Sequence, residues 1–290
     1  MKRTLGVVVT RHIWLGMVED HQLTDTHVYP SPGGGFWDIR SMASDAVAET
    51  IRNQIARVIQ AQPVEAIGLG FPGIMRDGVV EECPNYPQMK GYNLAAALTV
   101  NNPVTVVNRT DAMAAGIAAT HGQLEKVIRV WYLADGVGFG RYPRSDGIWE
   151  AGHSVVSLDP KERFCGCGGI GHLESIMGNR AMRLRFLDME PEEVFANAKA
   201  GDARCVEFVN LWHRALAAAT ATSVHLDGPG KFFVLGPNTE FVDARLLNQY
   251  LHEMVTMSSL QNSLFETLEG SREVAMIGAA LRAEQADDCR

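Results

Sequence analysis

The chain has 290 residues, of which 46% are hydrophobic and 21% charged, so it can bury one large core or two of moderate size. Its formal net charge of −8 argues against a nucleic-acid-binding protein, which needs a basic surface. No run of about 18 apolar residues is present, and the N-terminal apolar run LGVVV is too short for a secretion signal. We therefore expect a cytoplasmic protein with neither a membrane nor a nucleic-acid partner.

Strands and helices alternate along the first half of the chain. The β-rich runs 4–9 and 13–18 are close enough in sequence to pair as antiparallel neighbours. The Gly/Pro-rich stretch 29–37 follows, and it fits a linker, a lid or an interface loop equally well. Apolar spacing then predicts, in order, a helix over 41–62, buried strands over 64–73 and 102–108, and a helix over 111–122.

The second half repeats this alternation. A strand at 126–134 leads into a glycine loop at 135–140, and a long Ala-rich helix, a strand and a closing helix are predicted at 203–226, 231–236 and 272–285. Two successive sets of strands and helices predict an α/β fold with mostly covered sheets.

Two cysteines stand apart from the other three because of their spacing. Cys165 and Cys167 are one residue apart in the glycine-rich stretch ERFCGCGGIGHLES, residues 162–175. A disulfide between residues so close would close a strained, tiny loop. Metal binding is the better explanation, and the alternative is a surface loop with reduced cysteines.

Several further segments are distinctive. In chain order they are GLGFPGIMRDGVV (68–80), CPNYPQMKGYNL (83–94), NRTDAMAAGIAA (108–119), the joined pattern EAGH…CGCGGIGHLE (150–174) and IGAALRA (277–283). Together they resemble the motifs of the ROK family of sugar kinases and repressors. The joined pattern is the most specific of them, and it is similar to the family's Glu-x-Gly-His and zinc motifs.

The resemblance implies the two-lobed, actin-like α/β fold, in which sugar and nucleotide meet in an interdomain cleft. One lobe would comprise residues 1–112 with the C-terminal helix 276–290, and the other residues 113–275 with the zinc-binding loop. Because members of this family commonly form dimers and larger even assemblies, a homodimer is one implied state.

The resemblance also completes the metal site. The family has a third cysteine where this chain has His172, and it uses the histidine of Glu-x-Gly-His, here His153. The implied ligands are thus His153, Cys165, Cys167 and His172, and imidazole and thiolate both suit zinc. The ion would be structural and would orient Glu150 and Glu174.

Asp111 matches the family's catalytic base, and the implied reaction is phosphoryl transfer from ATP to a hydroxyl of a hexose-type sugar. An aspartate at a helix start is also a good N-cap, which is the alternative role. The sugar-binding residues implied by the family's pattern are Glu150, His153, Glu174, Asn85 and Thr110.

The phosphate-binding motifs depart from the family's pattern. The family begins with Asp-x-Gly-Gly-Thr, whose Asp helps to hold magnesium, whereas this chain has VVVTR at 7–11. Val7 cannot bind Mg²⁺, and an apolar hairpin is the simplest interpretation of this segment. Thr10 is the residue of this turn that we include among the nucleotide-binding candidates.

The second phosphate loop, ADGVGFG, keeps its glycines but has Asp135 where the family has a hydroxyl residue. A carboxylate beside ATP phosphates is repulsive unless a cation lies between them. One hypothesis is that Asp135 takes over part of the magnesium role, and the alternatives of equal weight are a lost site and a changed phosphate donor. The nucleotide-side candidates here are Asp135, Gly136, Gly138 and Gly236, although Pro237 removes a backbone donor.

Two functions remain open from the sequence. The first is an ATP-dependent sugar kinase that uses Mg²⁺, ATP and a structural Zn²⁺. The second is a catalytically inactive sugar-binding or structural relative that has lost ATP binding. The family's repressors carry an N-terminal DNA-binding segment, and this chain starts at its first strand with a negative net charge. The identity of the sugar and the oligomeric state are not determined by the sequence.

Overall fold

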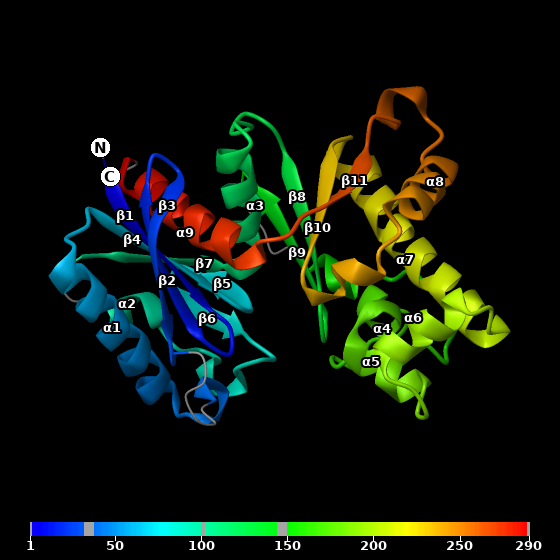
Figure 1. Cartoon of the computed structure of the whole chain (residues 1–290), viewed down its shortest axis with the longest axis horizontal. Coiled ribbons are helices and arrows are strands. Elements are labelled where there is room, and N and C mark those ends of the chain that lie inside the picture. Colours follow the sequence, from blue (N-terminus) through cyan, green and yellow to red (C-terminus); the bar gives the residue numbers. More distant parts are fainter. Residues whose placement is uncertain (1, 32–37, 100–101, 144–149, 289–290) are drawn as a thin grey trace. The chain divides into compact units, whose positions relative to one another are not determined.

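The computed structural model describes residues 2–31, 38–99, 102–143 and 150–288 (Figure 1). The chain divides into two compact α/β units. The first unit comprises Met1–Lys126, Gly140–Ile148 and Gly270–Arg290, and the second comprises Val127–Phe139 and Trp149–Glu269. Among the described residues, no helix is both long and apolar enough to span a bilayer.

A five-stranded sheet forms the centre of the first unit, in the order β3-β2-β1-β4-β7. Strands β1, β2 and β3 are antiparallel neighbours, whereas β1, β4 and β7 run parallel. The strand bounds are β1 Arg3–Val9, β2 Ile13–Glu19, β3 Gln22–Tyr29, β4 Ala66–Phe71 and β7 Val104–Asn108, and the small hairpin β5 Ile74–Arg76 and β6 Val79–Glu82 follows β4.

The two faces of this sheet differ in residue size, because side chains alternate along each strand. Leu5, Val7 and Val9 of β1 are fully buried in the core that α1 and α2 cover. On the opposite face, a Cβ at Gly6 would lie 1.9 Å from the Met276 carbonyl oxygen of α9. Glycine there allows α9 to pack directly on the sheet.

The helices of the first unit are α1 Ser44–Ala61, α2 Leu94–Leu98, α3 Arg109–Thr120 and α9 Ser271–Asp288. Helix α3 packs along α9, and both helices also contact β4. All of α3 therefore belongs to the first unit.

The second unit has a four-stranded sheet in the order β11-β10-β8-β9. Its strands are β8 Ile128–Leu133, β9 Val137–Tyr142, β10 Lys231–Leu235 and β11 Leu264–Thr267, and its helices are α4 Leu173–Met177, α5 Asn179–Arg185, α6 Pro191–Lys199, α7 Ala203–Asp227 and α8 Ala244–Met254. Trp131, Phe139 and Phe232 of the sheet share one apolar core with Trp212 and Leu216 of α7.

The predicted helices and the apolar strands are present with ends shifted by a few residues, but three features differ from the sequence prediction. Strand β3 was not predicted, because its polar, largely exposed sequence QLTDTHVY lacks the apolar alternation of a half-buried strand. The glycine loop expected at 135–140 is instead mostly strand β9, whose Val137 and Phe139 face the core between glycines. Strand β11 and the β5–β6 hairpin are too short to give a sequence signal.

The 29–37 loop lies only partly within the described residues. Strand β3 ends at Tyr29, and residues 32–37 lie outside the part of the chain that the structure describes.

A buried histidine joins α7 to the start of α8. His213 is 1% exposed, and its Nδ1–H donates to the Val209 carbonyl oxygen at 2.8 Å. Its Nε2 accepts the backbone N–H of Asp243, the N-cap residue of α8, at 3.0 Å. Burial lowers the pKa of His213 below its ordinary value, with the Asp243 carboxylate opposing that shift. The contact at Nε2 requires the neutral ring, because a protonated Nε2 cannot accept a hydrogen bond.

We predict that acidification destabilises the protein through His213. Because its pKa is lowered on folding, the unfolded state binds more protons, and stability present above about pH 6.5 is lost as the pH falls toward the lower folded pKa. His213→Gln should flatten the rise of the unfolding free energy between pH 5 and 7, measured by urea denaturation. The exposed His225, which makes the same contact with its i−4 carbonyl, is the control, and an equal effect of His225→Gln would contradict the prediction.

Candidate functional site

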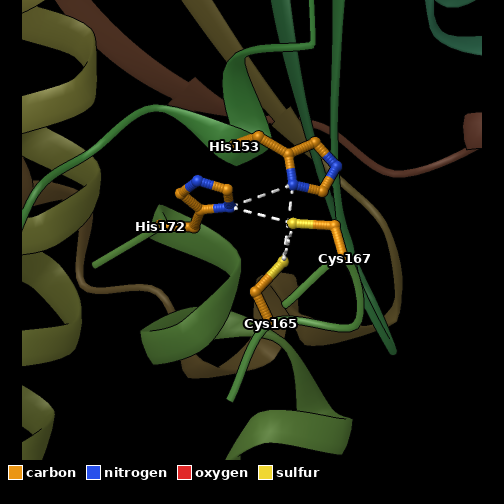
Figure 2. A group of neighbouring side chains, drawn as sticks. All are labelled: His153, Cys165, Cys167 and His172. Atoms are coloured by element: carbon orange, nitrogen blue, oxygen red, sulfur yellow. Dashed lines mark hydrogen bonds between the residues drawn. The ribbon is translucent and has the colours of Figure 1, made fainter. Parts of the chain in front are cut away.

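Four side chains of the second unit converge on one point (Figure 2). They are the sequence-predicted ligands His153, Cys165, Cys167 and His172, whose donor atoms all lie within 4.8 Å of one another. His153 comes from the short 3-10 helix Ala151–His153, and the other three come from the loop that leads into α4.

The spacing of these atoms fits a single ion. The two Sγ atoms are 3.3 Å apart and the two Nδ1 atoms are 3.3 Å apart. Cys165 Sγ is 3.4 Å from His153 Nδ1, and Cys167 Sγ is 3.2 Å from His172 Nδ1. A tetrahedral zinc ion, with nitrogen at about 2.0 Å and sulfur at about 2.3 Å, separates its ligands by about 3.3 to 3.8 Å. The residues therefore fit a metal ion of this kind.

The protonation of Cys165 depends on such an ion. Burial raises the pKa of this thiol well above its ordinary value, and the neighbouring carboxylate of Glu174 acts in the same direction. Without a cation the group is a neutral thiol, whereas a bound metal ion displaces the proton and takes the thiolate as its ligand.

Backbone hydrogen bonds give the metal-binding loop its shape. Val155 pairs with His172 in an antiparallel bridge, and Leu173 N–H donates to the Ser154 carbonyl oxygen at 2.9 Å. Cys165 N–H donates to the Ser175 hydroxyl at 3.1 Å, and Gly169 N–H donates to Cys167 Sγ at 3.3 Å. These bonds place both sulfurs on the same side of the loop.

An ion pair connects this loop to α5. The Glu162 carboxylate accepts a hydrogen bond from Arg185, and the two side chains are only 9% and 20% exposed. The Arg185 guanidinium also lies 4.8 Å from the centre of the Phe164 ring and donates to the Ser175 carbonyl oxygen at 3.4 Å. Since the Ser175 hydroxyl accepts the backbone N–H of Cys165, the contact of Arg185 with Ser175 supports the cysteine loop.

The Glu174 side chain lies between the predicted metal ligand Cys165 and the start of β9. Its Oε1 is 3.4 Å from Cys165 Sγ, and its Oε2 accepts the backbone N–H of Val137 at 3.1 Å. A Cβ at Gly136 would lie 2.5 Å from Oε2, so glycine leaves the space that this carboxylate needs. The structure thus brings the predicted sugar ligand Glu174 beside the predicted nucleotide-side Gly136.

Two other nucleotide-side candidates of the second unit, Asp135 and Gly236, lie near the end of β8. Asp135 follows Ala134, and a Cβ at Gly236 would lie 2.3 Å from the Leu133 carbonyl oxygen. The Ala134 carbonyl oxygen accepts the backbone N–H of Asn179 at 3.1 Å and the Asn238 side-chain amide at 3.4 Å. Asn238 follows Gly236 closely, and it is buried against the Asn179 side chain at 2.6 Å. Of the remaining residues, Asp135 is exposed, Gly138 lies within β9, and Glu150 is half-buried directly before the 3-10 helix.

Asp111 is in the first unit, at the third position of α3. The helix is capped by Asn108, whose Oδ1 accepts the Thr110 N–H at 2.8 Å, so the N-cap alternative for Asp111 is wrong. The Asp111 carboxylate instead accepts the backbone N–H of Arg141 at 3.0 Å. Residue 140 must be glycine for this approach, because a Cβ there would lie 2.0 Å from the Thr110 carbonyl oxygen.

Asn108 is a positioning residue that the sequence analysis missed. Its side chain caps α3, and it also donates to the Gly73 carbonyl oxygen at 2.7 Å, which connects the helix start to the Pro-Gly turn after β4. An asparagine between an apolar strand and a helix is an N-cap signal that could have identified it.

The hydroxyl of Thr110 is bonded within the protein, because it donates to Asn108 Oδ1 at 2.6 Å and the residue is 6% exposed. Thr10, in the turn between β1 and β2, donates its N–H to the His12 carbonyl oxygen at 2.8 Å, and its own carbonyl oxygen accepts the Tyr86 hydroxyl. Asn85 is exposed in the loop after β6. The first unit thus holds Asn85, Thr10, Thr110 and Asp111.

We predict that removal of one metal ligand releases the ion and destabilises the second unit. Cys165→Ser and His172→Gln should each lose one equivalent of zinc and lower the thermal unfolding temperature, since metal binding contributes directly to folding. Metal content by mass spectrometry and unfolding by calorimetry test this. Cys205→Ser, at a cysteine outside the group, should retain the metal, and unchanged metal content in the first two variants would contradict the prediction.

A second prediction concerns the ion pair behind the loop. Arg185→Met leaves the buried Glu162 carboxylate without its partner, which should cost on the order of 3 kcal/mol of unfolding free energy and speed the loss of metal to a chelator. The double variant Glu162→Gln/Arg185→Met should recover part of that loss. Arg204→Met breaks an exposed pair with Asp188 and should cost about 1 kcal/mol or less. Equal effects of the two arginine substitutions would refute the supporting role of Arg185.

Comparisons with known proteins agree with this fold. A glucokinase from Pyrobaculum calidifontis is 31% identical over 198 residues, which cover 63% of this chain and 66% of that protein. An N-acetylglucosamine repressor from Escherichia coli O157:H7 is 24% identical over 265 residues, which cover 81% of this chain and 64% of the repressor. The chain thus spans just under two thirds of the length of these curated relatives.

A crystal structure of a ROK hexokinase from Thermus thermophilus superimposes with a TM-score of 0.81 at 24% identity, covering 99% of this chain and 100% of that one. The fold is therefore the two-lobed, actin-like fold of the ROK sugar kinases. The family model of the ROK family matches residues 38–286. With a match of this extent, the chain belongs to the ROK family.

Proposed function

We propose that the protein is a sugar kinase that transfers a phosphoryl group from ATP to a hydroxyl of a hexose-type sugar, with Asp111 as the base. The observation that carries this proposal is the position of Asp111. Its carboxylate is held by the Arg141 N–H at the start of α3, while Asn108 performs the capping that would otherwise occupy it. The similarity to a glucokinase supports the same reaction class.

In the proposed reaction, Asp111 accepts the proton of the sugar hydroxyl as the hydroxyl oxygen attacks the γ-phosphorus in line. The bond between the γ-phosphorus and the β–γ bridging oxygen breaks, and ADP leaves with that oxygen. Glu150 and Glu174 would accept hydrogen bonds from other sugar hydroxyls, because each carboxylate can accept several. His153, Asn85 and Thr110 complete the proposed sugar ligands.

The metal held by His153, Cys165, Cys167 and His172 is, in this proposal, a structural zinc ion. Its ligand set of two thiolates and two imidazoles leaves no open position for a substrate. Its effect is to fix the loop beside Glu174, whose Oε1 is 3.4 Å from Cys165 Sγ.

The usual magnesium position at the first strand does not fit this chain. Val7 is fully buried in the apolar core, and the segment 7–11, VVVTR, contains no carboxylate. The N–H groups of Thr10 and His12 are also engaged within the turn. A Mg²⁺ ion would therefore find no carboxylate ligand in this segment.

These same features favour a second candidate function, which is sugar binding without phosphoryl transfer. A chain that binds sugar through Glu150 and Glu174 but does not bind ATP would act as a sugar-responsive relative of the kinases. Nucleotide binding distinguishes the two functions.

We predict that Asp111→Asn abolishes sugar-dependent ADP release, with a loss of at least about 100-fold in kcat, because a base contributes about 10² to 10⁴. The assay couples ADP release to a panel of hexoses and N-acyl hexosamines. Calorimetry should show that the variant still binds the sugar and Mg-ATP. Asp188→Asn, at an exposed aspartate of the second unit, should leave the rate unchanged. Full activity of Asp111→Asn would exclude this residue as the base.

A further inference from the structure

A cavity of about 400 Å³ in the second unit is lined by two arginines, one aspartate and one leucine. These residues are Asp135, at the turn between β8 and β9, and Arg180, Arg183 and Leu184 of α5. None of the three α5 residues matches a motif of the sequence analysis. The volume is within the range of about 300 to 1,000 Å³ that is usual for small-ligand sites.

Arg180 and Arg183 are three residues apart on α5 and therefore lie on the same face of the helix. Two like charges at this spacing are mildly unfavourable for the helix. The positive charge of Arg183 is compensated by two carboxylates, since its Nε is 2.6 Å from Glu190 and its Nη1 is 3.7 Å from Asp135. Arg180 has no acidic side chain within 4 Å among the residues that the structure describes.

The backbone fixes where Arg180 lies. Its N–H donates to the Asp135 carbonyl oxygen at 3.3 Å, which joins the start of α5 to the β8–β9 turn. Its Nη1 would be 2.6 Å from a Cβ at Gly166, between the two metal-binding cysteines, so glycine leaves room for the guanidinium. Arg180 is thus directed along the cysteine loop, exposed to solvent and close to the cavity.

We propose that Arg180, Arg183 and Asp135 bind the phosphate chain of the phosphoryl donor. This proposal rests on the proposed kinase function and deepens it. Guanidinium groups bind phosphate oxygens in pairs of charge-assisted hydrogen bonds, which suits a linear chain of phosphates. The Asp135–Arg183 contact is long and exposed, with side chains 69% and 45% exposed, so a phosphate can replace it at little cost.

The group formed by Asp135, Arg180 and Arg183 would compensate for the phosphate-binding groups that the β1–β2 turn of the first unit lacks. The β1–β2 turn offers neither a carboxylate nor free N–H groups at Thr10 and His12. The protein as a whole carries a charge of −8, which repels a polyanion, so attraction has to come from a local cluster. Asp135 would contribute through the divalent cation that accompanies the phosphates, because Mg²⁺ is commonly held by one carboxylate together with substrate phosphates.

Two donors share this chemistry, a nucleoside triphosphate and inorganic polyphosphate. Calorimetric titration of the metal-loaded full chain with ATP and with inorganic tripolyphosphate, both in Mg²⁺ buffer, separates them. We expect at least one of the two to bind, and Arg180→Gln and Arg183→Gln each to weaken that binding about 10-fold. The compound that binds more tightly is then assigned as the phosphoryl donor.

The double variant Arg204→Gln/Arg245→Gln is the control, because it removes the same charge from the second unit outside the cavity. It should bind as the unmodified protein does. Equal affinities of the unmodified protein and Arg180→Gln/Arg183→Gln would overturn the proposal, as would the failure of both phosphate chains to bind. Far-UV circular dichroism of each variant confirms folding, which substitution of exposed arginines should preserve.

Asp135→Asn gives an independent test. In Mg²⁺-free buffer it should bind tripolyphosphate more tightly than the unmodified protein, because a repelling carboxylate is removed, and in Mg²⁺ buffer this advantage should disappear. Unchanged affinity in both buffers would exclude Asp135 from the subsite.

The subsite and the kinase function can fail separately. If phosphate binding depends on the two arginines but no sugar is phosphorylated, the proposed phosphate subsite stands and the kinase function is excluded. If Arg180→Gln/Arg183→Gln phosphorylates the sugar with an unchanged KM for the donor, the kinase function stands and the proposed phosphate subsite is excluded.

Discussion

The close approach of four potential ligand atoms, all within 4.8 Å of one another, is the constraint on which the proposed site of the second unit depends. Two thiols and two imidazoles this close gain little from one another without a cation, whereas one ion satisfies all four. The ion would fix Cys165, whose sulfur contacts the Glu174 carboxylate, and Glu174 in turn accepts the Val137 N–H at the start of β9. A single ion would therefore connect the cysteine loop to both the sugar-side and the phosphate-side residues.

The first unit positions its carboxylate by different means. Asn108 caps α3 with its side chain, so Asp111 is left to accept the N–H of Arg141. Gly140 allows the close approach of the two segments, since any side chain there would collide with Thr110. A metal ion in the second unit and helix capping in the first would thus orient the two sets of proposed site residues by separate means.

The sequence predicted the elements with strong apolar periodicity, because periodicity is a local signal. The cysteine spacing and the family resemblance together named His153, Cys165, Cys167 and His172, whose potential ligand atoms the structure brings within 4.8 Å of one another. The sequence did not predict β3, whose exposed polar residues carry no such pattern, nor β9, whose glycines favoured a loop. The cavity beside Asp135 depends on α5 folding back against the β8–β9 turn, a contact between residues about 45 positions apart, so no local pattern marks Arg180. The buried ion pair of Glu162 and Arg185 could not be predicted from the sequence either, since the two residues are distant in sequence.

The central claim is that this chain phosphorylates a sugar in spite of its altered first phosphate motif. Phosphorus NMR of the metal-loaded protein with Mg-ATP and a mixture of hexoses tests it most directly. If the protein is a sugar kinase, a new sugar-phosphate resonance grows as ADP accumulates, and no such resonance forms when the sugar is omitted. A spectrum in which ATP stays intact beside a sugar that calorimetry shows to be bound would contradict the account and leave a protein that only binds sugar.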